Sequence, residues 1–302
     1  MNLILAIWVE WSHLLCLWLE QNYGNVNVNF LICIEPQIII RDPIVNMLRI
    51  WFFLEVLDWN MVIFQGKPKV TVIFLPITRI CINKLRTEAN LSKEYVGETI
   101  ERKSNDLAKI FCRGNENLER YITYSLRELM RNIEEHSMAD YIWYAAQYWE
   151  TYDLVEIAIL DEGIGIRESL TTNPAYTRII KNDEDALLMA IKPGITKARG
   201  KANKEDDWAN SGYGLYMTSN LCRNVGDFVL ASNERLLIIN KDNISKKEIC
   251  YFGTVVRMRL QISKLKALQS VLNRLLQEGE QQAKENQYAI KTASKASSML
   301  RK

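Results

Sequence analysis

The sequence has few of the residues that build metal centres or disulfide frameworks. Its 302 residues include only two histidines, His13 and His136, and six cysteines. The cysteines are Cys16, Cys33, Cys81, Cys112, Cys222 and Cys250, with no Cys-x-x-Cys pair among them. This spacing and the scarcity of histidine argue against a zinc site and predict buried thiols in a reducing compartment. We therefore expect a cytoplasmic protein.

The sequence also lacks an excess of charge of either sign. Its 38 lysines and arginines nearly balance 36 acidic residues, so no strong signal indicates nucleic acid or a membrane as partner. The apolar stretch from Leu3 to Leu19 is interrupted by Glu10 and His13, which fits neither a membrane span nor a signal peptide. Its apolar positions form one helical stripe, as in a helix on a core, with a docking surface for a partner as the alternative.

A hydrophobic fraction of 48% is that of a globular protein, and the chain is long enough for two domains. Residues 25–34 and Val70–Leu75 have the composition of strands, the second ended by Pro76, with the apolar stretch Ile44–Leu57 between them as a helix. This predicts a small α/β domain over residues 1–95. The polar segment Asn83–Arg113 contains its boundary, because that segment lacks a long apolar stripe.

Residues 96–262 have an α+β pattern, and residues 263–302 form a C-terminal amphipathic helix with a polar tail. The first helix of this domain runs from Asn115 to His136, with Asn115 or Asn117 as its N-cap. Glu128 and Asn132 lie one turn apart on it, where a carboxylate and an amide oxygen can face the same small volume. Two solvated side chains at this common spacing are the alternative.

The apolar strand Leu154–Leu160 leads directly into Asp161, Gly163 and Gly165. An aspartate fixed at a strand end can accept a hydrogen bond from an exocyclic amine, and the glycines allow a flat ligand to approach the backbone. A surface Asp-x-Gly turn is an equally good interpretation of these residues alone.

Two further glycine elements follow in the sequence. Gly212 and Gly214 precede a helix that begins near Leu215, where free backbone N–H groups can bind phosphate, although a plain loop-to-helix turn has the same pattern. Thr254 follows Gly253 and opens the strand Val255–Leu260, where its hydroxyl could face a base or have no functional role.

In this order and spacing the four elements resemble the N box, the glycine boxes and the final Gly-Thr of the GHKL, or Bergerat-fold, ATPases. The resemblance covers about residues 100–262 and implies an α/β sandwich with a mainly antiparallel sheet and helices on one face. It implies that Asp161, Thr254, Gly163 and Gly165 surround adenine and that Ile166 also belongs to the nucleotide site. It further implies that Thr196, Gly212, Gly214 and Leu215 contact the nucleotide, that Asn132 binds Mg²⁺, and that Glu128 is the catalytic acid–base residue.

The segment Ile180–Asn210 would be the ATP lid, with Lys197, Arg199 and Lys201 as phosphate partners. For each of these three residues taken alone, a solvated side chain in a loop is the alternative. Glu134 and Glu135 depart from the family pattern, which has a basic residue there, and the glycine run before the lid helix is short. Residues 1–95 are loosely similar to the STAS-like module that precedes such domains in some bacterial proteins.

Three functions follow from the resemblance. The first is an ATPase that works as an ATP-driven switch with a protein partner, a homodimer being compatible with it. The second is a serine or threonine kinase of the anti-sigma partner-switching type, whose N box ELMRNIEEHS resembles. The third is a non-hydrolysing, ATP-gated interaction module. A self-phosphorylating histidine kinase is disfavoured because His13 is the only histidine upstream of the N box.

Overall fold

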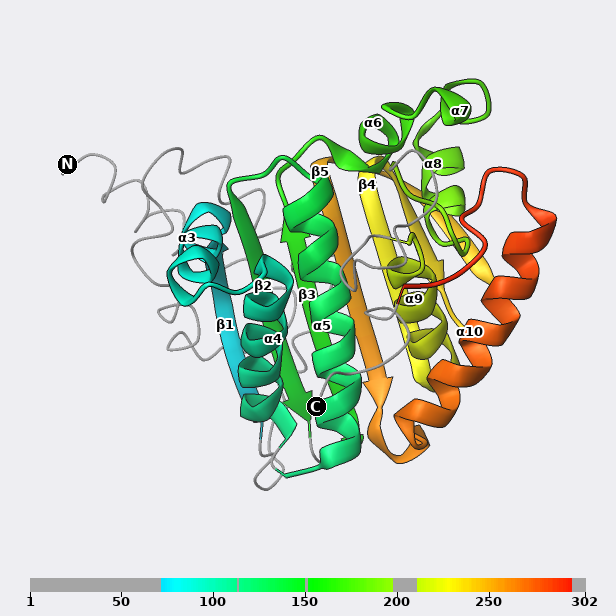
Figure 1. Ribbon diagram of the computed structural model, residues 1–302. Coiled ribbons are helices and arrows are strands. Elements are labelled where there is room, and N and C mark those ends of the chain that lie inside the picture. Colours follow the sequence, from blue (N-terminus) through cyan, green and yellow to red (C-terminus); the bar gives the residue numbers. More distant parts are fainter. Residues whose placement is uncertain (1–71, 113, 150–151, 198–210, 295–302) are drawn as a thin grey trace, which may run out of the picture. The chain divides into compact units, whose positions relative to one another are not determined.

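The computed structural model describes residues 72–112, 114–149, 152–197 and 211–294 (Figure 1). They belong to one of the two units into which the chain divides, Thr71–Lys302. The predicted N-terminal helix and the elements expected over residues 25–34 and Ile44–Leu57 lie outside the described residues. The similarity to a STAS-like module therefore stays a prediction.

The described strands form one five-stranded sheet. They are β1 (Val72–Cys81), β2 (Tyr141–Trp149), β3 (Leu154–Asp161), β4 (Gly226–Ile239) and β5 (Ile244–Gln261). Their order is β1-β2-β3-β5-β4, and every pairing among them is antiparallel. The predicted α+β class with an antiparallel sheet is confirmed.

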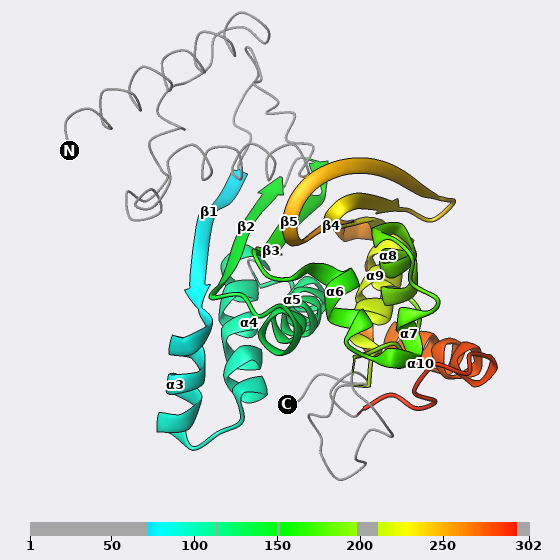
Figure 2. The same ribbon diagram turned by 90° about the horizontal axis from the view of Figure 1, so that it is seen from above.

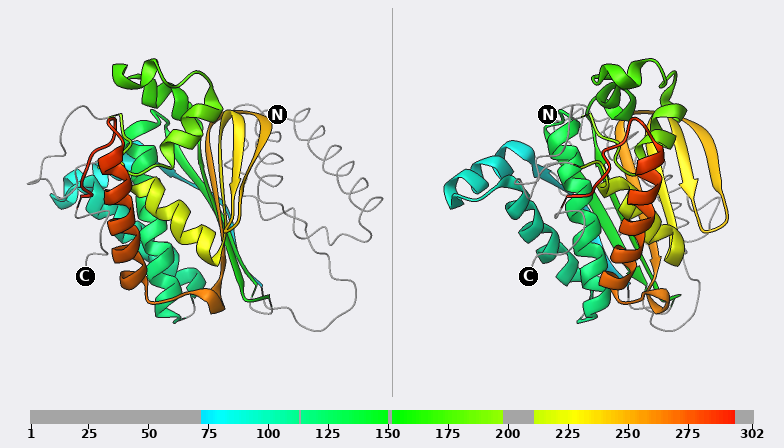
Figure 3. Two further views of the ribbon diagram at one scale, coloured as in Figure 1. Left: turned by 90° about the vertical axis from the view of Figure 1, so that its right-hand side faces the viewer. Right: turned by 45° about the vertical axis from the view of Figure 1, so that its right-hand side comes forward.

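Helices cover one face of this sheet (Figure 3). The layer contains α3 (Ile82–Ser92), α4 (Val96–Cys112), α5 (Glu116–His136), α9 (Gly214–Val225) and α10 (Leu268–Glu285). Three short helices follow β3, namely α6 (Gly165–Thr171), α7 (Pro174–Thr177) and α8 (Asp183–Ala190), and η4 (Ile262–Lys264) follows β5. Seen from above, α6 and α8 lie beside β4 and β5 (Figure 2).

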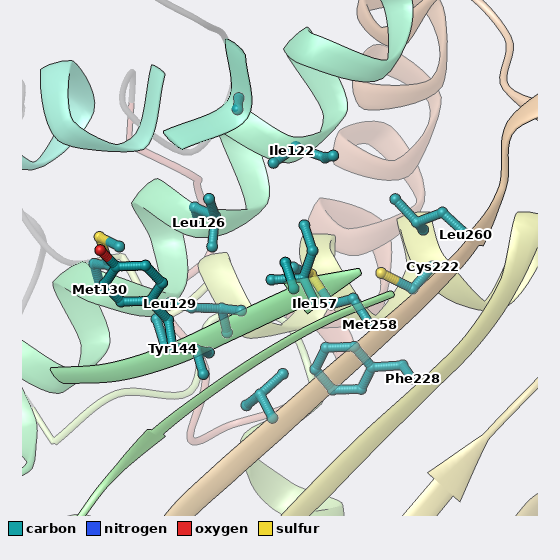
Figure 4. Close-up of a cluster of buried hydrophobic side chains, with 14 of the residues drawn as sticks. Ile122, Leu126, Leu129, Met130, Tyr144, Ile157, Cys222, Phe228, Met258 and Leu260 are labelled. Atoms are coloured by element: carbon teal, nitrogen blue, oxygen red, sulfur yellow. The ribbon is translucent and has the colours of Figure 1, made fainter. Parts of the chain in front are cut away.

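The core lies between α5 and the sheet. Ile122, Leu126 and Leu129 of α5 point toward Ile157 and Met258 of the two central strands (Figure 4). The α5 stripe repeats every three or four residues and the strand residues alternate, so each element turns its apolar side to the same layer. Asn115 is the N-cap, its side chain accepting a hydrogen bond from the Leu118 N–H at 3.1 Å. The prediction of this helix is confirmed.

Several boundaries predicted from the sequence are wrong. β1 continues past Pro76, because a register shift between Leu75 and Thr78 accommodates the residue that cannot donate a ladder hydrogen bond. The polar segment Asn83–Arg113 forms α3 and α4 instead of a boundary, and the chain divides after Val70, ahead of residue 95.

The sequence did not reveal the apolar sides of α3 and α4, because each side has few apolar residues. Leu85 and Ala89 of α3, and Ile100 and Ala108 of α4, are buried between charged residues. Cys250 is exposed, which contradicts the prediction of buried thiols at that position, and all four described cysteines are free.

The segment predicted as a lid loop contains α8, which packs on β4 and α6. Asn182 caps this helix by accepting from the Asp185 N–H at 2.9 Å, and Lys246 of β5 forms an ion pair with Glu184 at 2.6 Å. Arg199 and Lys201 lie outside the described residues. Within the described ranges, no helix combines the length and apolarity needed to cross a membrane.

Candidate functional site

A buried aspartate ends the central strand β3. Asp161 is 2% exposed and lies opposite Thr254 of β5 in the sheet register. The Gly163 N–H donates to its Oδ1 at 2.8 Å. Burial raises the pKa of Asp161 to about 7, although hydrogen bonds from Gly163 and Thr254 oppose this shift. The carboxylate is therefore costly to ionise unless a ligand supplies a further donor.

The chain leaving Asp161 is attached to the end of α5. A β-carbon on Gly163 would lie 2.0 Å from the carbonyl oxygen of Ser137, so no larger residue fits without a shift. The next residue, Ile164, donates its N–H to that same oxygen at 2.9 Å. This close approach brings the last turn of α5 beside the end of β3.

Hydrogen bonds and close packing hold the start of α6 against β4 and β5. Gly165 has a φ of +75°, and a β-carbon there would lie 2.8 Å from the Ser232 hydroxyl oxygen. That hydroxyl accepts from the Ile166 N–H at 2.9 Å and donates to the Gly253 carbonyl at 2.8 Å. One buried serine thus connects α6, β4 and β5 around the strand end.

The turn Gly212-Tyr213-Gly214 brings α9 against α5. Gly212 has a φ of +72°, and a β-carbon there would lie 2.4 Å from the Ile195 carbonyl oxygen. A β-carbon on Gly214, the first residue of α9, would lie 2.3 Å from Oε2 of Glu128. Gly212 is required by its positive φ and by the Ile195 backbone, whereas a larger residue at position 214 would have to displace the end of the Glu128 side chain.

A pocket opens between these elements. Most of the predicted site residues line it, namely Asn132, Asp161, Gly165, Ile166, Thr196, Gly212, Gly214, Leu215 and Thr254. The apolar lining comes from Leu129, Ile133, Ile159, Leu170, Ala190, Ile195, Leu230 and Val256, and the remaining polar lining from His136, Ser137, Ser169 and Lys197. An apolar cavity with a few convergent polar groups is the usual form of a small-molecule site.

Glu128 does not line this pocket, contrary to the expectation that it shares a volume with Asn132. It is 3% exposed, and the Arg127 guanidinium forms an ion pair with its Oε1 at 2.9 Å. Arg131 approaches the same oxygen at 4.0 Å. The Oε2 of Glu128 also lies close to Gly214, which does line the pocket. Gly163 is also absent from the lining, because it faces Ser137.

His136 is a pocket residue to which we assigned no role from the sequence. It follows Asn132 by four positions, and that helical spacing was the available signal. Burial lowers its pKa, an effect that Glu135 opposes and Lys197 reinforces. The imidazole is therefore neutral at physiological pH and can donate from one ring nitrogen and accept at the other.

The apolar walls could also have been inferred from periodicity. Ile159 precedes Asp161 by two residues and Val256 follows Thr254 by two, so strand alternation places them on the same face of the sheet. Leu129 and Ile133 are one helical turn apart on α5. The contribution of Ile195 had no sequence signal, because it depends on a turn that packs against Gly212.

Asn132 is the one predicted metal ligand in the pocket. No group of three or more His, Cys, Asp or Glu side chains in the described ranges is arranged to hold a metal ion. A neutral amide oxygen is nevertheless a suitable partner for Mg²⁺, which retains water and takes its remaining ligands from substrate phosphates. The residues present thus fit a metal that enters with a phosphate ligand.

Comparisons with known proteins add no assignment. Neither the protein-family models nor the curated proteins with which the sequence was compared give a match.

Proposed function

We propose that this chain binds ATP with Mg²⁺ in a Bergerat-type pocket. The observation that carries the proposal is the pairing of buried Asp161 with Thr254 beside the apolar walls of the pocket. A carboxylate in this environment favours a ligand that donates a hydrogen bond to it, as the exocyclic amine of adenine does. Apolar walls from β3, β5 and α5 suit the two faces of a flat ring.

The opposite side of the pocket has groups suited to phosphates. The N-terminus of α9 lies at Gly214, where unsatisfied N–H groups and the helix dipole favour an anion. Lys197 supplies positive charge, and Thr196 and Asn132 supply neutral polar groups. When it is bound, Mg²⁺ neutralises phosphate charge, and Asn132 would hold it.

Hydrolysis is the less supported part of the proposal. Glu128 lies close to Gly214 at the N-terminus of α9, but it is buried, it is paired with Arg127, and it does not line the pocket. The arrangement favours binding, with hydrolysis only if Glu128 leaves Arg127 and reaches the cavity. We place this ATP-dependent switch in the cytoplasm, since free thiols fit a reducing compartment.

Calorimetric titration with ATP and Mg²⁺ tests the binding. We expect Asp161→Asn to weaken affinity at least tenfold, because an amide nitrogen would face the adenine amine, and Asn132→Ala to reduce only the Mg²⁺-dependent part. The control Asp140→Asn changes an exposed aspartate away from the pocket and leaves affinity unchanged. Equal affinities in wild type and both pocket variants would refute the pocket assignment.

A second experiment follows the γ-phosphate. Wild type is incubated with γ-labelled ATP, Mg²⁺ and candidate partner proteins. Label released as free phosphate supports an ATPase, and label on a partner protein supports a kinase. Label that stays in ATP, together with measurable affinity, supports a binding switch without turnover, which is the outcome favoured by the burial and ion pair of Glu128.

A further inference from the structure

The segment after α10 reaches back to the pocket. Residues Asn286–Ser294, here called the C-terminal strap, are held against the end of α10 by Lys291, whose ammonium donates to the Ala283 carbonyl at 2.6 Å. The Ala293 N–H also donates to Glu280 at 3.3 Å. The strap is therefore fixed relative to the helix layer.

The strap contacts both chain segments that flank the phosphate side of the pocket. On one segment, the Ile290 N–H donates to the Gly194 carbonyl at 2.8 Å. On the other, the Ser294 N–H donates to Ser211 Oγ at 2.9 Å. Thr196 and Gly212, which line the pocket, lie within two residues of these contacts.

Close backbone packing continues these contacts into the pocket. A β-carbon on Gly194 would lie 2.2 Å from the Ile290 carbonyl oxygen, and the Gly194 N–H donates to the Gly212 carbonyl at 3.1 Å. Tyr213, the central residue of the glycine turn, is buried and directs its hydroxyl to the carbonyls of Ile290 and Lys291 at 3.2 Å each. The backbone of the strap thus packs directly against Gly194, and the backbone of Gly194 packs against Gly212.

We propose that the C-terminal strap is a positioning element for nucleotide binding, acting through Tyr213 and Gly194 on the Gly212 turn. This inference rests on the proposed function, because it assigns the strap to the phosphate side of that pocket. The strap contacts named above fall on Gly194, Ser211 and Tyr213, so we assign its effect to the geometry of the turn. Linkage requires the reverse effect as well, namely that bound nucleotide stabilises the docked strap.

Two matched tyrosine variants of the full chain separate positioning from general stability. Tyr213→Phe removes the hydroxyl that donates to the strap, and Tyr216→Phe removes one that donates to the Leu275 carbonyl of α10 at 3.3 Å. Both side chains are buried, and each loses a hydroxyl whose single proton is donated to backbone carbonyl oxygen, so we expect similar losses of stability. Only Tyr213→Phe is expected to weaken ATP affinity, by about fivefold for the loss of one neutral hydrogen bond.

A reversible cross-link provides the rescue. The hydroxyl oxygens of Ser211 and Ser294 are 3.3 Å apart, so cysteines at both positions are close enough for a disulfide. The variant to be tested carries Ser211→Cys and Ser294→Cys together with Cys250→Ser and Tyr213→Phe. We expect oxidation of the new cysteine pair, verified by peptide mapping, to restore the ATP affinity lost in Tyr213→Phe. Reduction of the disulfide is expected to lower the affinity again.

Amide hydrogen exchange gives a readout that does not depend on measured affinity. We expect saturating ATP to slow exchange at Ile290 and Ser294 in wild type. Equal affinities for Tyr213→Phe and Tyr216→Phe, with no change in exchange at these two amides, would overturn the strap inference while the proposed function stands. Absence of ATP binding by wild type itself would overturn both.

Discussion

Replacing Asp161 by asparagine is expected to stabilise the folded chain while it weakens ATP binding. Burial raises the pKa of Asp161 from the ordinary value of 3.8 to about 7. The folded chain therefore holds this proton more tightly than the unfolded chain does, and stability falls as pH rises through the interval from about 4 to about 7. Asparagine carries no proton to lose and escapes this cost.

The magnitude follows from the shift. About three pKa units at roughly 1.4 kcal/mol per unit gives a destabilisation of about 4 kcal/mol once Asp161 is fully ionised, as an upper estimate. At about pH 5 the folded chain still holds the proton, and the cost is only about 1.5 to 2 kcal/mol. Asparagine can keep the hydrogen bond from the Gly163 N–H through its side-chain oxygen. The advantage of the variant is thus expected to grow by roughly 2 to 3 kcal/mol between about pH 5 and about pH 8.

Urea denaturation of the ligand-free protein measures this difference. Wild type, Asp161→Asn and the exposed control Asp140→Asn are unfolded at both pH values, and the free energies of unfolding are compared. The control is expected to follow wild type at each pH. If the difference between Asp161→Asn and wild type does not grow with pH, Asp161 does not carry a raised pKa, and the argument from its burial fails.

Three further predictions concern the same site. Because the adenine amine favours the ionised carboxylate, the ATP dissociation constant is expected to rise below about pH 7, approaching tenfold per pH unit; a flat calorimetric profile from pH 5 to pH 8 would contradict this. Gly163→Ala places a methyl group against the Ser137 carbonyl and is expected to lower the midpoint of thermal unfolding. The control Gly114→Ala is expected to lower it less, because the added methyl group meets no atom within 4 Å and only the positive φ opposes it. Glu128→Gln is expected to leave ATP affinity within about twofold of wild type, as measured by titration, because the side chain lies outside the pocket lining; a loss of tenfold or more would show that the carboxylate contacts the nucleotide.

Elements with strong local periodicity were predictable from the sequence. The stripe of α5 and the apolar run of β3 each identify an element and its buried side without knowledge of the rest. The pairing of Asp161 with Thr254 followed from strand ends and the resemblance together, and the sheet register confirms that they lie opposite each other.

What could not be predicted depends on contacts between distant segments. The sequence shows Glu128 and Asn132 at a spacing that suits a shared site, but only Asn132 lines the pocket, and Glu128 lies against Gly214 of another helix. Pro76 indicates a strand end locally, although a bulge lets β1 continue. The two glycines at positions 212 and 214 indicate a turn, whereas their neighbours in space, Ile195 and Glu128, come from segments that no local pattern connects to it.

The contacts of the strap also have a consequence for how this domain folds. Ser211 and Ser294 are 83 residues apart in the chain, and Tyr213 and Ile290 are 77 apart. Closing such long loops lowers the entropy of the chain before the contacts can stabilise it. These pairings are therefore expected to form late, after the local helices and hairpins. During synthesis the glycine turn emerges from the ribosome long before its partner in the strap does. Acquisition of the completed pocket would then mark the final stage of folding, and a nucleotide that stabilises it would bind most tightly to chains that have reached that stage.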